Sequence, residues 1–225
     1  MHLSINTNML AKSVLTLMTV AHLSGCIIHV GGGAEDGSGR VSSVFGGLTV
    51  SEGKHVSDVN SVNGSIDLED HVSAEDVETV NGSIEIGDNV SVDDAETVNG
   101  DIDIGRNFSS SGFVETVNGD IRILRNSQVG GNVKTVNGDI ELSGVSVNGD
   151  ADTRNGDVTL TNNTHIKGDV VFHHNKGANR WKSVPSLTIS ADSKVDGQII
   201  LHREVKLDFD DAELLKKVQY KYNVE

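Results

Sequence analysis

The sequence predicts an all-β fold, a single-stranded parallel β-helix whose chain winds into triangular coils of 18–19 residues. A unit of Thr-Val-Asn-Gly, an acid or serine, and Ile-x-Ile recurs along the chain. A finer period of six separates aliphatic residues, as in Val80, Ile86, Val92 and Val98. A helix of period 3.6 cannot keep such a set on one face, so three short strands joined by corners account for it best. The asparagines of the Asn-Gly pairs recur every 18 or 19 residues, at Asn63, Asn81, Asn99, Asn118, Asn137 and Asn155.

Each repeat predicts a strand followed by a corner. Within Ile102-Asp103-Ile104 the isoleucines point inward and the aspartate points outward, as pleating requires. Asn-Gly is expected at the corner because these residues tolerate a positive φ. Stacked coils then bring the asparagines to about 4.8 Å, where their amides form a structural ladder. The alternative is that each Asn-Gly is a hairpin turn in an antiparallel sandwich, which accounts less well for the regular spacing.

The two ends of the chain differ from the repeats. The stretch DDAELLKKVQYKY predicts a short C-terminal capping helix starting near Asp210 or Asp211, with Leu214, Leu215 and Val218 on one face. The expected organisation is a signal peptide over 1–25, a lipidated cysteine and flexible tether over 26–40, the β-helix over 41–209, and the C-terminal helix and tail over 210–225.

The N-terminal residues indicate export. The apolar run from Val14 to Leu23 has the length of a signal-peptide core and is too short to span a bilayer. Leu23-Ser24-Gly25-Cys26 resembles the bacterial lipobox. That resemblance implies cleavage before Cys26, diacylglycerol and palmitate on this residue, and a durable membrane anchor. By the same resemblance, Ile27 favours the outer membrane. A plain signal peptide, or a buried helix with an incidental cysteine, is the alternative.

The repeated TVNGDI and TVNGSI units resemble the adhesin-domain family of bacterial envelope proteins, over roughly residues 41 to 205. The resemblance implies a right-handed parallel β-helix. The six-residue spacing also resembles left-handed hexapeptide-repeat proteins, but that family prefers small residues where this chain has Ile84, Val90 and Ile102. Bactofilins, cytoplasmic β-helices that polymerise end to end, share the coil size.

The chain carries a formal charge of −15 and has no basic stripe, which argues against nucleic-acid binding. Its acidic residues recur at equivalent positions of successive repeats, so stacked coils would align them in columns. No cofactor is needed to explain these columns. One hypothesis places Ca²⁺ between the carboxylates, and the alternative is a solvated acidic face. The calcium-like stretch Asp150 to Asp157 fails the EF-hand pattern. The weak candidates for a metal follow the corner glycines, at Asp101, Asp120, Asp139 and Asp157. The other columns contain Asp67, Glu85, Asp103 and Glu141, broken by Arg122, and Glu78, Glu96 and Glu115, relieved by Lys134.

The stretch from Val170 to Leu187 interrupts the repeat and contains the only tryptophan and the only proline. A loop on a rigid scaffold is often a binding site, and Trp and Arg are common at binding hot spots. A tolerated insertion, or a lid over one end of the core, is the alternative. The candidate binding residues of this loop are His173, His174, Arg180, Trp181 and Lys182.

The expected protein is not an enzyme. It is a lipid-anchored protein of the bacterial cell envelope that presents a rigid solenoid for binding or adhesion. Besides the membrane, its partner would be an envelope protein, a glycan or another copy of itself. A structural scaffold that self-assembles end to end is the alternative. A hexapeptide-like enzyme, of acyltransferase or zinc carbonic anhydrase type, is the second alternative. It would have to use His165, His173, His174 or His202, yet the adjacent His173 and His174 would point to opposite faces.

Overall fold

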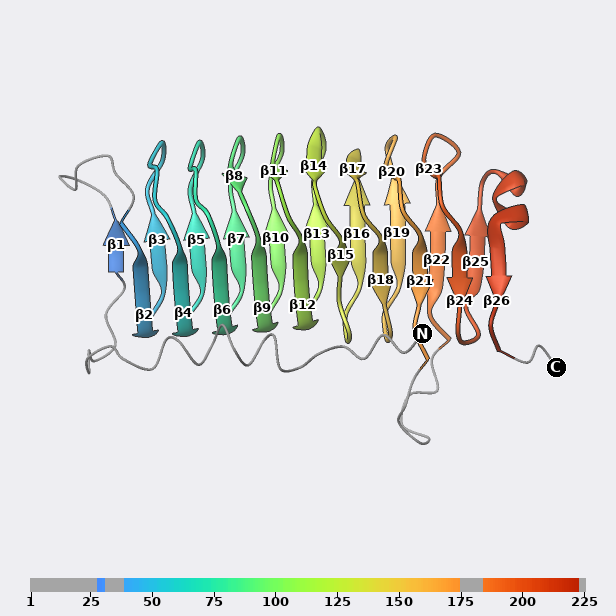
Figure 1. The fold of residues 1–225 in the computed structure, drawn as a ribbon, viewed down its shortest axis with the longest axis horizontal. Coiled ribbons are helices and arrows are strands. Elements are labelled where there is room, and N and C mark those ends of the chain that lie inside the picture. The colour runs from blue at the N-terminus through green and yellow to red at the C-terminus, as the bar shows by residue number, and fades with distance from the viewer. Residues whose placement is uncertain (1–27, 31–38, 175–183, 223–225) are drawn as a thin grey trace.

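The computed structural model describes residues 28–30, 39–174 and 184–222, and these residues form a parallel β-solenoid (Figure 1). Coils follow one another along a single axis, from the N-terminal strands at one end of the row to the C-terminal strands at the other. Three parallel sheets, here called A, B and C, make the three faces of the coil. The predicted triangular β-helix is therefore confirmed.

Two of the sheets have ten strands each and the third has six. Sheet A contains β1 (Ile28–Val30), β3 (Leu48–Val50), β5 (Ile66–Leu68), β7 (Ile84–Ile86), β10 (Ile102–Ile104), β13 (Ile121–Ile123), β16 (Ile140–Ser143), β19 (Val158–Thr161), β22 (Ser186–Ile189) and β25 (Lys206–Phe209). Sheet B contains β2 (Val41–Phe45), β4 (Val59–Asn63), β6 (Val77–Asn81), β9 (Ala95–Asn99), β12 (Val114–Asn118), β15 (Val133–Lys134), β18 (Ala151–Thr153), β21 (Val170–Phe172), β24 (Ile199–Leu201) and β26 (Val218–Tyr220). Sheet C contains β8 (Ser91–Val92), β11 (Ser109–Ser110), β14 (Ser127–Val129), β17 (Val145–Val147), β20 (His165–Ile166) and β23 (Lys194–Val195).

The core consists of like residues stacked on like residues. In β10 the side chains of Ile102 and Ile104 are buried, and Asp103 between them points outward. Parallel pairing sets Ile102 against Ile84 on one side and Ile121 on the other. Each coil is too thin to have a core of its own, so apolar burial depends on its two neighbours.

The corner glycines are required for a reason other than the predicted one. Gly100 does not adopt a positive φ, so the expectation that Asn-Gly provides left-handed backbone at this corner is wrong. Instead, a Cβ on Gly100 would lie 2.1 Å from the carbonyl oxygen of Gly82 on the preceding coil. The same close approach recurs at Gly64, Gly82 and Gly119. Glycine is needed because the coils stack too closely for any side chain.

The C-terminal cap also differs from the predicted helix. Ala212–Lys217 form a 3₁₀ helix, η1, whose N-cap is Asp211, and Leu214 is buried while Leu215 is 53% exposed. The chain then returns to the solenoid as β26, which pairs with β24. At the other end β1 pairs with β3, so the solenoid extends beyond the expected residues 41–209 on both sides. The helix ends in Lys217, whose Nζ donates to the carbonyl oxygens of Val195 at 2.6 Å and Asp196 at 3.0 Å.

Replacing Gly100 by alanine should destabilise the fold by about 3 kcal/mol or more, because backbone atoms of the preceding coil occupy the space of the new methyl group. Gly53→Ala is the control: its Cβ would meet open space, and only the positive φ of +70° would cost roughly 1–2 kcal/mol. Urea unfolding followed by circular dichroism measures both. Equal losses would show that close stacking does not set the choice of glycine.

Candidate binding surface

An amide ladder follows the corner between sheets B and A. The Nδ2 of each asparagine donates to the Oδ1 of the asparagine one coil earlier. The ladder runs without a break through Asn63, Asn81, Asn99, Asn118, Asn137 and Asn155, with donor–acceptor distances of 2.8–3.0 Å. These exposed side chains hold the coils in register from outside the core.

Both ends of this asparagine ladder have partners. At the start, Asn63 Nδ2 donates to the carbonyl oxygen of Val44 at 3.3 Å. At the far end, the Oδ1 of Asn155 accepts from Arg203 Nη1 at 3.0 Å, and the same guanidinium nitrogen donates to the Arg154 carbonyl at 2.9 Å. The arginine thus ends the ladder with a positively charged donor.

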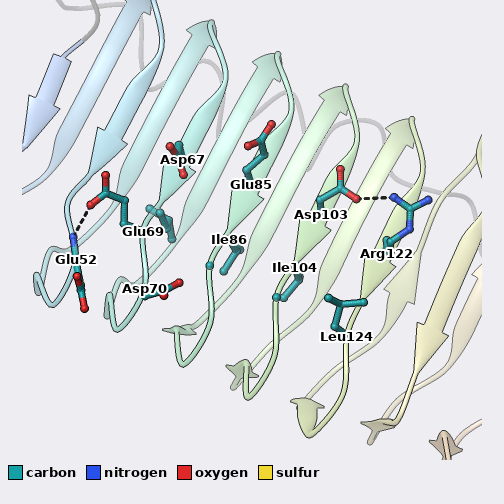
Figure 2. A pocket seen from close by; sticks show the side chains of 13 residues that line it. Glu52, Asp67, Glu69, Asp70, Glu85, Ile86, Asp103, Ile104, Arg122 and Leu124 are labelled. Atoms are coloured by element: carbon teal, nitrogen blue, oxygen red, sulfur yellow. Dashed lines mark hydrogen bonds and ion pairs between the residues drawn. The ribbon is translucent and has the colours of Figure 1, made fainter. Parts of the chain in front are cut away.

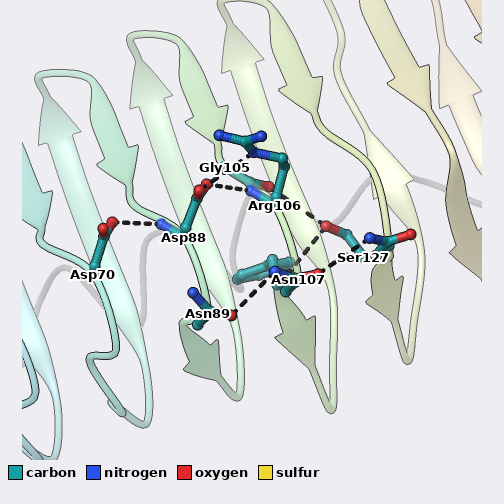
Figure 3. A network of polar contacts seen from close by, with 9 residues as sticks. Asp70, Asp88, Asn89, Gly105, Arg106, Asn107 and Ser127 are labelled. Carbon is teal, nitrogen blue, oxygen red and sulfur yellow. Dashed lines mark hydrogen bonds and ion pairs between the residues drawn. The ribbon is translucent and has the colours of Figure 1, made fainter.

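A second ladder, which the Asn-Gly repeat did not predict, lies at the corner between sheets A and C (Figure 3). Asn89, Asn107 and Asn126 have positive φ angles of 60°, 57° and 63°. Asn107 Nδ2 donates to Asn89 Oδ1 at 3.0 Å, and Asn126 Nδ2 donates to Asn107 Oδ1 at 3.3 Å. The left-handed corner backbone predicted for Asn-Gly is therefore found here. The sequence contained a signal for this second ladder: an asparagine stands before the next strand in each of these coils, again at spacings of 18 and 19 residues.

The aspartates after the corner glycines support the stacking. Asp101 Oδ1 accepts the backbone amide of Asp120 at 2.8 Å, and the same contact links Asp120 to Asp139 at 2.7 Å and Asp139 to Asp157 at 2.8 Å. Each carboxylate thus binds the next coil. Among the described residues, no group of three or more His, Cys, Asp or Glu side chains is placed to hold a metal ion. The structure thus shows these four aspartates as links between coils at the corner.

An acidic groove of about 680 Å³ runs along the outer face of sheet A (Figure 2). Asp67, Glu85 and Asp103 point outward from successive strands, and Arg122 stands on the next strand. The guanidinium of Arg122 lies 3.0 Å from Asp103 Oδ1 and 3.0 Å from Glu141 Oε2, so it neutralises the C-terminal end of the row. Partial burial, followed by the charge of Glu69, raises the pKa of Asp67.

A second row of acids occupies the outer face of sheet B. Glu78, Glu96 and Glu115 lie on neighbouring strands and are half-buried, which we call the glutamate file. Burial raises the pKa of Glu96 to about 7, and the charges of Glu78 and Glu115 contribute to the rise. Lys134 lies 3.5 Å from Glu115 and offsets part of the effect for the last glutamate. The file therefore holds one carboxyl that resists ionisation at neutral pH.

The structure describes only part of the predicted binding loop. Cys26, Arg180, Trp181 and Lys182 lie outside the described residues. The ring of His173 stacks on that of His202, with centroids 6.2 Å apart and planes inclined by 5°. Beside the loop is a cavity of about 340 Å³, lined by Asn155, Val184, Pro185 and Arg203 among others. The described part of this region is thus a surface built around the end of the asparagine ladder.

No family model, no curated protein and no solved structure matches this chain. Within the described part of the chain, no helix is long and apolar enough to cross a membrane. Function must therefore be inferred from the solenoid and its surfaces.

Replacing Asn99 by alanine should cost about 1–2 kcal/mol, because it removes one donor and one acceptor in the middle of the asparagine ladder. The matched control is Asn148→Ala. Asn148 stands in a similar Val-Asn-Gly-Asp sequence, but its Oδ1 accepts from Lys167 Nζ instead of a ladder neighbour. Chemical unfolding compares the two, and similar small losses would mean that the ladder adds little stability.

Replacing Glu96 by glutamine should stabilise the protein above pH 7 by on the order of 2 kcal/mol. The folded state raises the pKa of Glu96 to about 7, so folding disfavours its ionised form. That penalty appears as the pH rises from about 4.5 to about 7 and is absent below about pH 4.5, where the carboxyl is protonated in both states. Melting temperatures from pH 4 to 8.5 measure the effect, with exposed Glu204→Gln as the control. A pH-independent gain for Glu96→Gln would contradict the assignment.

Proposed function

We propose that this chain is a non-enzymatic, lipid-anchored protein of the bacterial envelope that presents a rigid β-solenoid for binding. The proposal rests on sheet B, whose strands pair without a break from β2 to β26. This stacking holds the outward side chains of successive coils in fixed rows. Two amide ladders and the corner aspartates reinforce this register. A rigid repetitive surface of this kind favours recognition of an extended or repetitive partner.

The anchor is proposed from the N-terminal sequence. Leu23-Ser24-Gly25-Cys26 has the order of a lipobox and follows an apolar run. Acylation of Cys26 would place the solenoid on the membrane surface. Because Ile28–Val30 already pair with β3, only Ile27 separates Cys26 from the first strand, and the expected flexible tether over 26–40 is interrupted by β1. Ile27 supports the outer membrane as the destination, on the same resemblance.

The acidic groove of sheet A is the proposed binding face. Its row of Asp67, Glu85 and Asp103 offers outward carboxylates at the strand spacing of about 4.8 Å. Such a row favours an envelope protein or glycan that carries positive charges at a similar spacing. The loop that follows β21 is the second proposed contact.

The capped C-terminal edge supports a rod of fixed length over an end-to-end scaffold. Lys217 binds carbonyl oxygens at the last strand of sheet C, groups that a further coil would otherwise pair with. Stacking another copy at this end would have to displace η1. We therefore favour a binding role over a scaffold that assembles end to end.

Replacing Cys26 by serine should move the protein from the membrane pellet to the soluble fraction, because serine cannot receive the diacylglycerol thioether. Fractionation of cells and metabolic labelling with radioactive palmitate measure the change. The control is Ser24→Ala, which keeps a small residue in the lipobox. Membrane association that persists in Cys26→Ser, with labelling absent in both proteins, would rule out the anchor.

Binding is tested by co-purification from detergent-solubilised envelopes. The double variant Asp67→Asn with Glu85→Gln should recover less than about a tenth of the bound partner, because it removes two charges from the groove. Asp208→Asn, an exposed acid on β25 of the same sheet, is the matched control. Loss only on deletion of residues 175–184 would assign binding to the loop. Full retention in both variants would contradict a binding role for either surface.

A further inference from the structure

The last four strands of sheet B, β18, β21, β24 and β26, are each followed by a side chain that is a cation or becomes one on protonation. The strand register aligns these side chains in one outward column, because Phe172 and Leu201, which precede two of them, are fully buried. The backbone amides of three of them continue the pairing, as from His202 N to the Phe172 carbonyl oxygen at 2.9 Å. We call this column the basic row, and it contains Arg154, His173, His202 and Lys221.

The members of the basic row are close enough to influence one another. The ring of His173 stacks on that of His202, with centroids 6.2 Å apart and planes inclined by 5°. Burial lowers the pKa of His202, and the neighbouring charges of His173 and Lys221 lower it further. Protonation of both rings places a cation on every strand of the row, at the strand spacing of about 4.8 Å. An added anion would relieve the repulsion between these cations.

Arg154 has no anionic partner among the residues that the structure describes. Its guanidinium forms no ion pair with any of them, and its Nε is buried without a hydrogen-bond partner. The segment that follows His174, residues 175–183, contains three bases and no acid, so it has no carboxylate to offer. Buried donors are almost always hydrogen-bonded, so an orphaned guanidinium nitrogen in this row indicates that Arg154 recognises an external anion.

Asp152 offsets part of the positive charge from the neighbouring column. It is 7% exposed, and its Oδ2 lies 3.7 Å from His173 Nε2. An imidazolium has two N–H donors, so this contact leaves Nδ1 of His173 for a ligand. The formal charge of −15 on the whole chain does not prevent binding here, because charges more than about 8 Å away are largely screened at physiological salt. A small anion therefore responds to the local row.

We propose that the basic row binds a small anion that carries two or more phosphate groups. The planar guanidinium of Arg154 matches two phosphate oxygens, and Lys221 supplies a point charge at the other end of the row. Three strand spacings, or about 14 Å, separate these two residues, which is enough for more than one phosphate group. A phosphate group brings about two negative charges and three acceptor oxygens, so it suits a row of donors better than a carboxylate does.

A small anion is favoured over a lipid bilayer because of the rest of the face. The glutamate file lies on the same face of sheet B, toward the N-terminus, and an extended anionic surface would meet it as well. A small ligand contacts only the C-terminal end. The inference does not depend on the acidic groove of sheet A or on acylation of Cys26.

Binding should add protons to the two histidines of the row. A histidine is mainly neutral at pH 7.5, and an anion beside it favours the imidazolium form. The remaining titratable or charged groups beside the row are unchanged in the histidine variants below, so a difference in proton uptake reports on His173 and His202. These remaining groups are Asp152, Arg154, His174, Arg203, Glu204, Tyr220, Lys221 and Tyr222.

Isothermal titration calorimetry of the detergent-solubilised full chain with fructose 1,6-bisphosphate tests the site. Arg154→Gln and Lys221→Gln should each weaken binding at least about fivefold. Lys206→Gln, an exposed lysine on β25 of sheet A, is the matched control and should leave the affinity unchanged. Lys221 is exposed, so its variant keeps the test valid even if Arg154→Gln loses stability. No binding to the parent, or equal affinities of Lys221→Gln and Lys206→Gln, would overturn the inference.

The same titration at pH 7.5, in two buffers of different ionisation enthalpy, measures proton uptake. The parent should take up at least about half a proton per ligand, and His173→Gln with His202→Gln should abolish this uptake. The ligand itself cannot cause it, because phosphate ionises for the second time near pH 6 and bound cations favour the dianion. His55→Gln, at an exposed position far along the sequence, is the control. Equal uptake in the parent and the double variant would contradict the role of the histidines.

Two further ligands separate the other possible partners of the row. Citrate carries carboxylates only and should bind at least about tenfold more weakly, so an equal affinity for citrate would overturn phosphate as the recognised group. Vesicles of phosphatidylcholine mixed with phosphatidic acid present phosphate as a lipid headgroup, and they should not sediment the Cys26→Ser chain. Sedimentation with these vesicles that is lost in Lys221→Gln would identify a membrane as the partner and overturn the small anion.

Discussion

Register between successive coils is the constraint on which the rest of this structure depends. Each coil is a single layer of backbone, and its amides and carbonyls must meet those of the coils before and after it. A slip of one residue would turn the inward isoleucines outward and the outward acids inward. The molecule prevents the slip at its corners, where side chains also bond from coil to coil. Asn99 bonds to Asn81, Asn107 bonds to Asn89, and Asp101 accepts the amide of Asp120.

The same stacking brings acidic side chains close together, and other contacts of the fold offset their repulsion. Parallel strands place like residues side by side, so an acid in the repeat becomes a row of acids on the surface. The corner aspartates are stabilised because each accepts a backbone amide from the next coil. On sheet A, Arg122 bridges Asp103 and Glu141. In the glutamate file, burial and the charges of Glu78 and Glu115 outweigh the opposing effect of Lys134 and raise the pKa of Glu96 to about 7.

The outer faces therefore differ in what they can bind, although one repeat generates them all. Sheet A presents a groove of outward carboxylates, suited to a cationic partner. On each coil from β6 to β12, sheet B presents a half-buried valine beside a half-buried glutamate.

The sequence by itself determined the coil, because spacings of six and of 18–19 residues fit a three-sided stack of parallel strands better than a helix or a hairpin sandwich. It also predicted the asparagine row and the inward isoleucines, since both follow directly from that period. Only the tertiary structure decided which physical role each corner residue has and how the C-terminal end is capped. Gly100 serves close approach to Gly82 rather than a positive φ, and Asn107 takes the left-handed corner instead. The end cap became a 3₁₀ turn followed by β26 because the exposed edge of β24 was available for pairing. Such choices depend on atoms of neighbouring coils, which are far away in the sequence and close only after folding.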